Sequence, residues 1–451
     1  MSREKLNLYD IVILALRKAV NLGADEAEAY AIRIKDHGIT INNNMITSTE
    51  THYEIGVGIR VVVDDKIGYA STNNLSIQSI EKTIMDAISI AKASEKDPYW
   101  QGLPMPTEYE VPENLYSADL ARVPEDSLAE KARQLLDLII SDKRLVVVYG
   151  SVSASLSSIA IANTNGVSNI QHLTHSIIYV GVVANENGDV TPVVSDFIYS
   201  RTNIPDVESI ANRVKDYALS SLRPVKINSM KAPVILHPGA VNSLLQYTLL
   251  DAIRGDNVIR GKSYLTGKEG KQVFSEKLTI TDNGLLKNGL FTRMFDDEGI
   301  AMKNTLIIEK GIVRGFIFDN YWALRYGSNS TGNALRSSYK EVPRIAPTNV
   351  VIEQGDASLN EIIAETRRGL LVYGLQGAHS SNPETGEYSV VATPAWYIEN
   401  GVLKPVRGVM LSGNIYDDLS KIEFMSREYM QKGHVVAPYI RLEDVNIIVK
   451  G

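Results

Sequence analysis

The first 75 residues alternate between helical and strand-like periodicity, which limits the folds open to the chain. Apolar residues follow a helical spacing over 5–22, and Gly23 then provides a good stop signal. In the four runs that follow, apolar and polar residues alternate as in strands: 27–35, 38–42, 54–63 and 66–71. The tight turn Asp64–Asp65 joins the last two runs. We therefore predict a mostly antiparallel sheet with helices set against it.

The character of the sequence changes near Val225. Before it, further helices are predicted at 76–93, 124–141 and 206–222, and strands fill 145–194 around a hairpin-type turn in IANTNG (161–166). After it, the chain is rich in strands and turns, with one long helix and three probable short ones: 237–256, 321–326, 359–366 and 417–431. We predict an α+β protein of two domains. Residues 1–225 form an N-terminal antiparallel sheet with helices, and residues 226–451 form a β-rich barrel- or sandwich-like domain.

Composition excludes several classes of function. The chain has 451 residues, a net charge of −7 and no cysteine. The absence of cysteine excludes disulfides, thiolate nucleophiles and cysteine metal ligands. An acidic chain without clustered Lys and Arg argues against nucleic-acid binding. No apolar run approaches the roughly 20 residues that cross a bilayer, and the first residues do not read as a signal peptide. We expect a cytoplasmic protein that binds neither nucleic acid nor membrane.

The stretch 237–256, HPGAVNSLLQYTLLDAIRGD, predicts a single helix with a buried apolar stripe. Pro238 suits the first helical position, where its missing N–H is not needed. Gly255 is expected to close the helix in a left-handed conformation.

Several segments, in the right order over nearly the whole chain, resemble the TldD/PmbA family. They are GADEAE (23–28), GVGIRVVVDDKIGYAST (56–72), IANTNG (161–166), GKQVFSEKLTITDN (270–283), FDDEGIAMKNTLIIEKG (295–311), NSTGNALR (329–336), GEYSVVATPAWYIENG (386–401) and GVMLSGNIYDDLSKI (408–422). The last two resemble the region that distinguishes the PmbA branch, also called TldE. The resemblance implies a heteromeric metallopeptidase in which TldD-type subunits hold zinc and PmbA/TldE-type subunits are their partners.

The resemblance also indicates where zinc would be held. In the TldD branch a helix carries His-Glu-x-x-x-His followed by Gly-x-x-Gly-Asp, and a cysteine near the C-terminus is the third ligand. Here the matching positions are Gln246, Tyr247 and Asp251, followed by 252–256, and no cysteine is present. A neutral amide is a poor zinc ligand, and a tyrosine of ordinary pKa near 10 cannot replace the glutamate base at neutral pH.

The favoured interpretation is therefore a PmbA/TldE-like subunit with no catalytic residue, metal ligand or cofactor of its own. It would act with a TldD-like catalytic subunit, which holds the zinc, on peptides or unfolded polypeptides. Two alternatives remain. One is an active metal-dependent hydrolase with a non-standard site, for example His237 with Asp251 or with the carboxylates of FDDEG (295–299). The other is a homodimeric regulatory or binding protein, as the family's older label of gyrase modulator suggests.

Other candidate residues have simpler interpretations. His237, beside a helix start, is expected to cap or pack rather than bind metal. His172 and His175 have a spacing that places them on opposite faces of a strand, which argues against a shared ion. FDDEG could bind Ca²⁺ or Mg²⁺, but we favour a turn whose carboxylates accept bonds from the backbone.

A possible substrate groove is predicted in a glycine-rich region. Glycines at 369, 374, 377 and 386, together with Ser380, Ser381 and Asn382, suggest a long, mobile loop. We expect Gly377, His379, Ser380 and Asn382 to form one wall of a peptide groove. A β-rich domain would also offer sheet edges to which an extended peptide can add as a strand.

Overall fold

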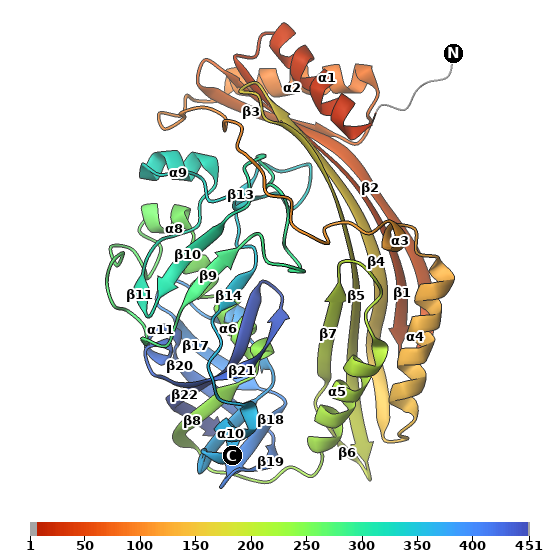
Figure 1. Ribbon diagram of the computed structural model, residues 1–451, viewed down its shortest axis with the longest axis vertical. Helices are drawn as coiled ribbons and strands as arrows, with labels where there is room; N and C mark the ends of the chain where they lie inside the picture. Colours follow the sequence, from red (N-terminus) through yellow and green to blue (C-terminus); the bar gives the residue numbers. More distant parts are fainter. Residues whose placement is uncertain (1–6, 450–451) are drawn as a thin grey trace.

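The chain forms two large β-sheets and one two-stranded sheet in a computed structural model that describes residues 7–449 (Figure 1). The first sheet is antiparallel throughout, with the order β3-β2-β1-β4-β5-β6 and β7 paired with β5. Its strands are β1 Glu26–Asn42, β2 Met45–Val63, β3 Lys66–Thr72, β4 Leu145–Asn163, β5 Ser168–Glu186, β6 Asp189–Val190 and β7 Val194–Ser200. The predicted N-terminal antiparallel sheet is therefore confirmed.

Helices accompany this sheet close to where the sequence places them. They are α1 Leu8–Asn21, α2 Ile77–Ala93, α3 Ala118–Ala121, α4 Glu125–Ile140 and α5 Val207–Ser220. Side chains of Asn7, Ser76 and Asp206 cap α1, α2 and α5 by accepting bonds from backbone N–H groups of the first turn. The helices predicted at 76–93, 124–141 and 206–222 are confirmed. Residues 5 and 6 of the first predicted helix lie outside the described residues.

The two faces of the first sheet have different neighbours. Residues 27–35 and 38–42 were predicted as separate strands but form the single strand β1, which pairs with β2 from end to end. Alternate residues of β1, such as Ala29 and Ile39, lie in the cores that also contain the helices. The residues between them, such as Tyr30 and Ile32, pack with Phe295 and Tyr339 of the C-terminal half. The bowed sheet therefore has helices on one face and the C-terminal half against part of the other (Figure 1).

The second sheet is mixed and branched, and it draws all its strands from residues 230–449. Its main order is β11-β10-β9-β14-β22-β8-β15-β18-β19, and β16, β17, β20 and β21 extend it. Strand pairs β8–β15 and β14–β22 are parallel. The strands are β8 Met230–Leu236, β9 Ile280–Asn283, β10 Asn304–Glu309, β11 Ile312–Val313, β14 Val350–Ile352, β15 Arg368–Val372, β16 Leu375–Gln376, β17 Glu387–Ala392, β18 Ala395–Glu399, β19 Val402–Val406, β20 Val409–Asn414, β21 Ile422–Lys432 and β22 Val435–Val449.

Short helices and one small ribbon complete the C-terminal half, which is β-rich as predicted. Strands β12 Ala334–Leu335 and β13 Arg344–Ile345 pair with each other. The helices are α6 Pro238–Gln246, α7 Leu249–Ala252, α8 Gly255–Ile259, α9 Asn320–Tyr326, α10 Leu359–Ala364, α11 Ile415–Leu419 and the 3₁₀ turn η1 Ala378–Ser380. The α+β fold class is confirmed. Within the described residues, no helix is long and apolar enough to span a bilayer.

The single helix predicted over 237–256 is wrong. The segment forms α6, α7 and α8, and the first break lies at Thr248, whose φ of −139° and ψ of −87° leave the helical region. Gly255 does not end a helix in a left-handed conformation, because it begins α8. Apolar residues on both sides of the break, such as Leu244 and Leu249, remain buried in one core. Hydrophobic periodicity therefore continues through the break and conceals it.

The helix predicted over 417–431 is also wrong. Only Ile415–Leu419 is helical, and the chain then enters β21, which pairs antiparallel with β22. The register of this pair shifts between Met425 and Tyr429, which disturbs the alternation that would reveal a strand. Pairing with the long strand β22 thus decides a segment whose local pattern is ambiguous.

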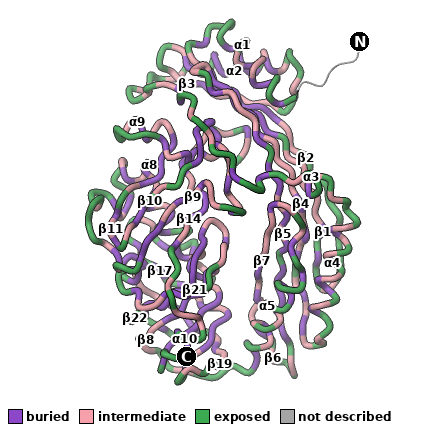
Figure 2. The backbone as a smooth tube through the Cα atoms, viewed as in Figure 1, coloured by how far each residue is buried: buried purple, intermediate pink, exposed green. Residues whose placement is uncertain are grey.

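The two halves share a hydrophobic core around α5. Tyr217 of this helix lies with its ring centroid 4.3 Å from Tyr373 of the C-terminal half and 5.5 Å from Trp396. Buried residues from β8, β15, β18 and β22 belong to the same core as α4 and α5. Figure 2 shows that buried residues run through both halves. The domain boundary at 225/226 falls between α5 and β8, and it stays a prediction.

Replacing Gly255 with alanine should destabilise the C-terminal half. A Cβ at this position would overlap the ring of Phe318, so the segment between α7 and α9 would have to shift. We expect Gly255→Ala to lower the free energy of unfolding by about 1–3 kcal/mol, as overpacking does in other cores. Urea unfolding followed by circular dichroism measures the change.

Gly38→Ala is the matched control, because a Cβ there meets no atom within 4 Å and the residue lies in an ordinary strand conformation. A loss of stability in Gly38→Ala equal to that in Gly255→Ala would contradict the proposed role of the Phe318 contact.

Candidate functional site

The three residues that match the zinc positions of the catalytic branch lie around the break after α6. Gln246 and Tyr247 end α6 and are exposed, and Asp251 lies in α7. The carboxylate of Asp251 accepts a bond of 3.2 Å from Nη1 of Arg254. Because the helix breaks between these residues, the relative orientation of Gln246 and Asp251 does not follow from the geometry of a regular helix.

The predicted groove residues lie close to one of these positions. The ring of His379 lies 6.4 Å from the ring of Tyr247, in a T-shaped arrangement. Gly377 adopts a φ of +87° and opens the turn η1, while Ser380 donates to its carbonyl oxygen. The structure therefore brings the 377–380 turn beside the end of α6. It does so through ring packing that sequence spacing does not reveal.

The long loop predicted around these residues is wrong in part. Gly369 lies inside β15, and Gly374 lies between β15 and β16. The side chain of Asn382 accepts bonds from the backbone N–H groups of Glu384 and Thr385, which define a turn. The segment therefore has regular structure, because β15 pairs with β8 and β18 in the interior of the second sheet.

The residues at these positions do not fit a zinc site. A catalytic zinc needs about three protein ligands and an open position for water. Gln246 offers a neutral amide, Tyr247 offers a phenol in place of a carboxylate base, and Asp251 is engaged by Arg254. Among residues 7–449, no three His, Asp or Glu side chains gather closely enough to hold a metal ion. We therefore derive no chemical step through a metal on this chain.

His237 caps α6 and is enclosed by aromatic rings. Its Nδ1 accepts a bond of 2.9 Å from the N–H of Gly239. Burial, together with the nearby ammonium of Lys432, lowers the pKa of His237 to about 3, so the ring is neutral at physiological pH. The rings of Tyr373 and Tyr439 lie 4.3 and 5.2 Å from it. This placement agrees with a capping role, although Nε2 is buried without a hydrogen-bond partner.

The other histidine pair also lies as its spacing indicates. His172 and His175 alternate between the two faces of β5. His172 is exposed, and its Nδ1 lies 2.8 Å from Oγ of Ser158 on β4. His175 pairs across the sheet with Ser155 on the other face. The two rings therefore do not face one common ion.

The carboxylates of FDDEG are buried and bond to the protein itself. Oδ1 of Asp296 accepts from the backbone N–H groups of Glu298 and Ile300, and its Oδ2 accepts from that of Ala334, all at 3.0 Å. Asp297 accepts from the N–H of Arg336 at 2.7 Å. The interpretation as a turn whose carboxylates bind the backbone is confirmed.

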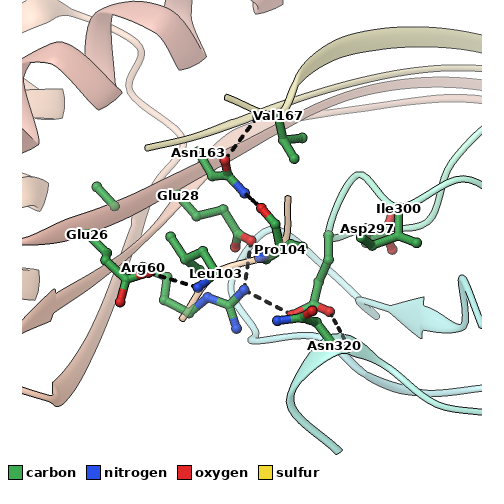
Figure 3. A network of polar contacts seen from close by, with 12 residues as sticks. Glu26, Glu28, Arg60, Leu103, Pro104, Asn163, Val167, Asp297, Ile300 and Asn320 are labelled. Carbon is green, nitrogen blue, oxygen red and sulfur yellow. Dashed lines mark hydrogen bonds and ion pairs between the residues drawn. The ribbon is translucent and has the colours of Figure 1, made fainter. Parts of the chain in front are cut away.

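Glu298 belongs to a buried network of charges that joins the two halves. Glu28 of β1 accepts from Nη2 of Arg60 at 2.7 Å and also from Nη2 of Arg336. The same Nη2 of Arg60 donates to Glu298 at 3.0 Å. The side chains of Glu28 and Arg336 are 1% and 0% exposed. We call these four residues, Glu28, Arg60, Glu298 and Arg336, the interface charge network. Figure 3 shows Arg60 and Glu28 pointing toward one another.

Burial and neighbouring charges shift the pKa values of these groups in different directions. Burial alone would raise the pKa of Glu28, but Arg60 and Arg336 outweigh it and hold the pKa below its ordinary value. Burial and then the carboxylate of Glu298 raise the pKa of Asp319 to about 8. The same two causes raise the pKa of Asp296 well above its ordinary range.

The connector between α2 and α3 is fixed beside this network. Oε2 of Glu26 accepts from the N–H of Leu103 at 2.8 Å, and Nδ2 of Asn163 donates to the carbonyl of Pro104 at 2.8 Å (Figure 3). Oδ1 of Asn163 also accepts from Val167, which closes the turn of IANTNG. This turn segment therefore serves to hold the connector in place.

Three domain models of one family match the chain in order. They describe PmbA/TldA metallopeptidase domain 1 at residues 27–91, the central domain at 81–222 and the C-terminal domain at 229–449. The chain belongs to the PmbA/TldD family. The resemblance inferred from the sequence is thereby confirmed.

Known relatives extend the match over the whole described fold. TldE from Thermococcus kodakarensis superposes with a TM-score of 0.93 and 32% identity, covering 97% of this chain and 100% of that one. An uncharacterized protein of Methanocaldococcus jannaschii is 30% identical over 433 residues, which is 94% of this chain and 98% of that protein. A zinc metalloprotease TldD homolog of Saccharolobus solfataricus is 24% identical over 432 residues, 92% of this chain and 91% of that protein.

The interface charge network should be essential to folding. Arg336→Met removes a buried cation and leaves the carboxylate of Glu28 and the backbone carbonyl oxygen of Asp297 each without one of their donors. Breaking a buried pair in this way destabilises proteins by about 3–5 kcal/mol, and we expect a loss of that size in urea unfolding. Lys96→Met removes an exposed ion pair with Asp64 and serves as the control, with no measurable change. Equal effects of the two substitutions would contradict this role.

The raised pKa of Asp319 should make stability fall as the pH rises from about 4 to about 8, with no further decrease from this group above about pH 8. In the unfolded chain Asp319 ionises above about pH 4, whereas in the folded chain it keeps its proton until about pH 8. The folded state therefore binds more protons, and stability decreases by up to about 1.4 kcal/mol per pH unit for each extra proton. Burial lowers the pKa values of His175, His237 and His434. These histidines change the stability only below about pH 6.5, where the unfolded chain binds protons that the folded chain does not.

Thermal unfolding between pH 6.5 and 8.5 tests this expectation. Asp319→Asn keeps an acceptor for the N–H of Trp322 but cannot ionise. We expect this variant to lose part of the decline in melting temperature that the parent chain shows. An identical decline in both proteins would exclude Asp319 as a source of it.

Proposed function

We propose that this chain is a PmbA/TldE-like, non-catalytic subunit of a TldD-type zinc metallopeptidase complex that acts on peptides or unfolded polypeptides. The observation that carries the proposal is the set Gln246, Tyr247 and Asp251 at the end of α6 and in α7. These residues occupy the positions that match the zinc motif but cannot supply two imidazole ligands and a glutamate base. The similarity to TldE over nearly the full chain supports the same assignment.

Hydrolysis would then belong to a partner. Zinc lowers the pKa of a bound water, and a nearby carboxylate takes the proton, so both must lie in one subunit that has the ligands. We propose a TldD-like partner for that role, in the cytoplasm. This chain would contribute a wall of the peptide path, in which Tyr247 and the turn Gly377, His379 and Ser380 face outward together.

The fold suits the role of a wall better than that of a catalyst. The four buried charges of the interface charge network are paired with one another inside the protein. Its exposed aromatic and amide groups near α6 can contact a peptide without reacting with it. The proposal therefore assigns shape and contact to this chain.

Metal analysis and reconstitution test the proposed function. We expect the purified chain to hold far less than one zinc per molecule and to show no peptidase activity. Mixed with the TldD-like chain of the same organism, it should co-migrate in size-exclusion chromatography and give activity that a chelator removes.

The separate chains are the controls for this experiment. Stoichiometric zinc in the isolated chain, with chelator-sensitive peptidase activity, would overturn the non-catalytic assignment. Failure of the two chains to associate at micromolar concentration would overturn the assignment as a TldD partner.

A further inference from the structure

A cavity of about 550 Å³ lies between the two sheets, away from the segment that matches the zinc motif. Its walls come from β7, the turn after β9, β14, β21 and β22, which are far apart in the sequence. Ligand pockets typically have volumes of roughly 300–1,000 Å³, so this cavity is large enough to hold part of a peptide. We call it the inter-sheet cavity.

The surface of the inter-sheet cavity is mainly aliphatic and aromatic. Leu286 and Val351 are half-buried aliphatic residues of the lining, and Ile352 and Val436, which also line it, are buried. The rings of Tyr199 and Tyr429 form part of its walls, and Tyr429 is 60% exposed. Such a surface gains free energy when an apolar side chain displaces water from it.

The residues that line the inter-sheet cavity carry no net charge. Lys287 and Glu353 are its charged residues, both exposed and of opposite sign. Lys287 already forms an ion pair of 2.7 Å with Glu113. The remaining polar groups, on Asn288, Gln354 and Gln431, are neutral amides. A neutral ligand fits this lining, whereas a phosphate or a carboxylate would be transferred from water without a free buried cation.

The edge of β21 adds a place for main-chain hydrogen bonds. Between Tyr429 and Lys432 this strand pairs with β22 on one side, and within residues 7–449 no strand pairs with its other edge. An extended peptide can bond to the N–H and C=O groups of such an edge while it places a side chain in a neighbouring pocket.

We propose that the inter-sheet cavity binds an aliphatic side chain of an extended, neutral polypeptide segment. This inference rests on the proposed function, because it gives the non-catalytic subunit a substrate-holding site of its own. It assigns the preference for apolar residues to this chain and leaves bond cleavage to the partner.

Direct binding to the isolated chain tests the inference without the partner. The probe is a fluorescein-labelled glycine–serine peptide with a single leucine, compared by anisotropy with the same peptide carrying aspartate instead. We expect the leucine peptide to bind at least about tenfold more tightly, since a carboxylate loses its hydration in the cavity. No measurable binding of the leucine peptide, or equal affinity for the two peptides, would overturn the proposal.

Two substitutions locate the binding. Leu286→Trp fills the cavity and should abolish the preference for leucine, and Tyr429→Ala should weaken binding about five- to tenfold by removing a wall. Tyr53→Ala is the matched control, because Tyr53 is 65% exposed and lies on β2, outside the cavity lining. Circular dichroism verifies that each variant is folded. Wild-type affinity in folded Leu286→Trp would place the peptide elsewhere.

The absence of cysteine allows an independent mapping of the site. Tyr429→Cys introduces a single thiol, to which benzophenone maleimide can be attached. Illumination should crosslink the leucine peptide to this variant and not to the equally labelled Tyr53→Cys. Crosslinking of equal yield at both positions would overturn the location. Because these measurements use the chain alone, their failure is distinguishable from failure of the two subunits to assemble.

Discussion

The structure depends on a small group of buried charges at the boundary between the two halves. Glu28 and Arg60 come from the first sheet, and Glu298 and Arg336 come from the C-terminal half. Each charge would be strongly destabilising if it were buried alone. Glu28 and Arg60 pair within the first sheet, but Glu298 and Arg336 find their partners only when the halves are correctly placed. The network therefore makes the relative position of the two sheets a condition of folding.

Features that concern function follow from this placement. The inter-sheet cavity exists because β7 is held opposite β14 and β21. The segment from α6 to α8 packs inside the C-terminal core and presents Gln246 and Tyr247 outward. This segment therefore packs in the core on one side and is open to solvent at Gln246 and Tyr247 on the other.

Local patterns predicted regular elements well and interruptions poorly. The caps at Ser76 and Asp206 and the alternation in β1 fix elements by interactions among near neighbours. The break at Thr248 and the strand β21 depend on distant contacts, so the same patterns were misread there. Among candidate site residues, the positions of Tyr247 and His379 side by side needed the tertiary structure. The amide residues around the cavity, Asn288, Gln354 and Gln431, gave no local signal at all.

The sequence by itself determined the α+β class, the strand-rich C-terminal half and the family, because periodicity and ordered motifs are properties of the chain. The sequence also led us to match Gln246, Tyr247 and Asp251 with the zinc positions of the catalytic branch, and this match stays a prediction. Only the tertiary structure decided that FDDEG is a buried turn whose carboxylates accept backbone hydrogen bonds, that α6 ends at Gln246, and that a cavity lies between the sheets. These features depend on contacts between buried residues that are far apart in the sequence, and local sequence patterns do not specify such contacts.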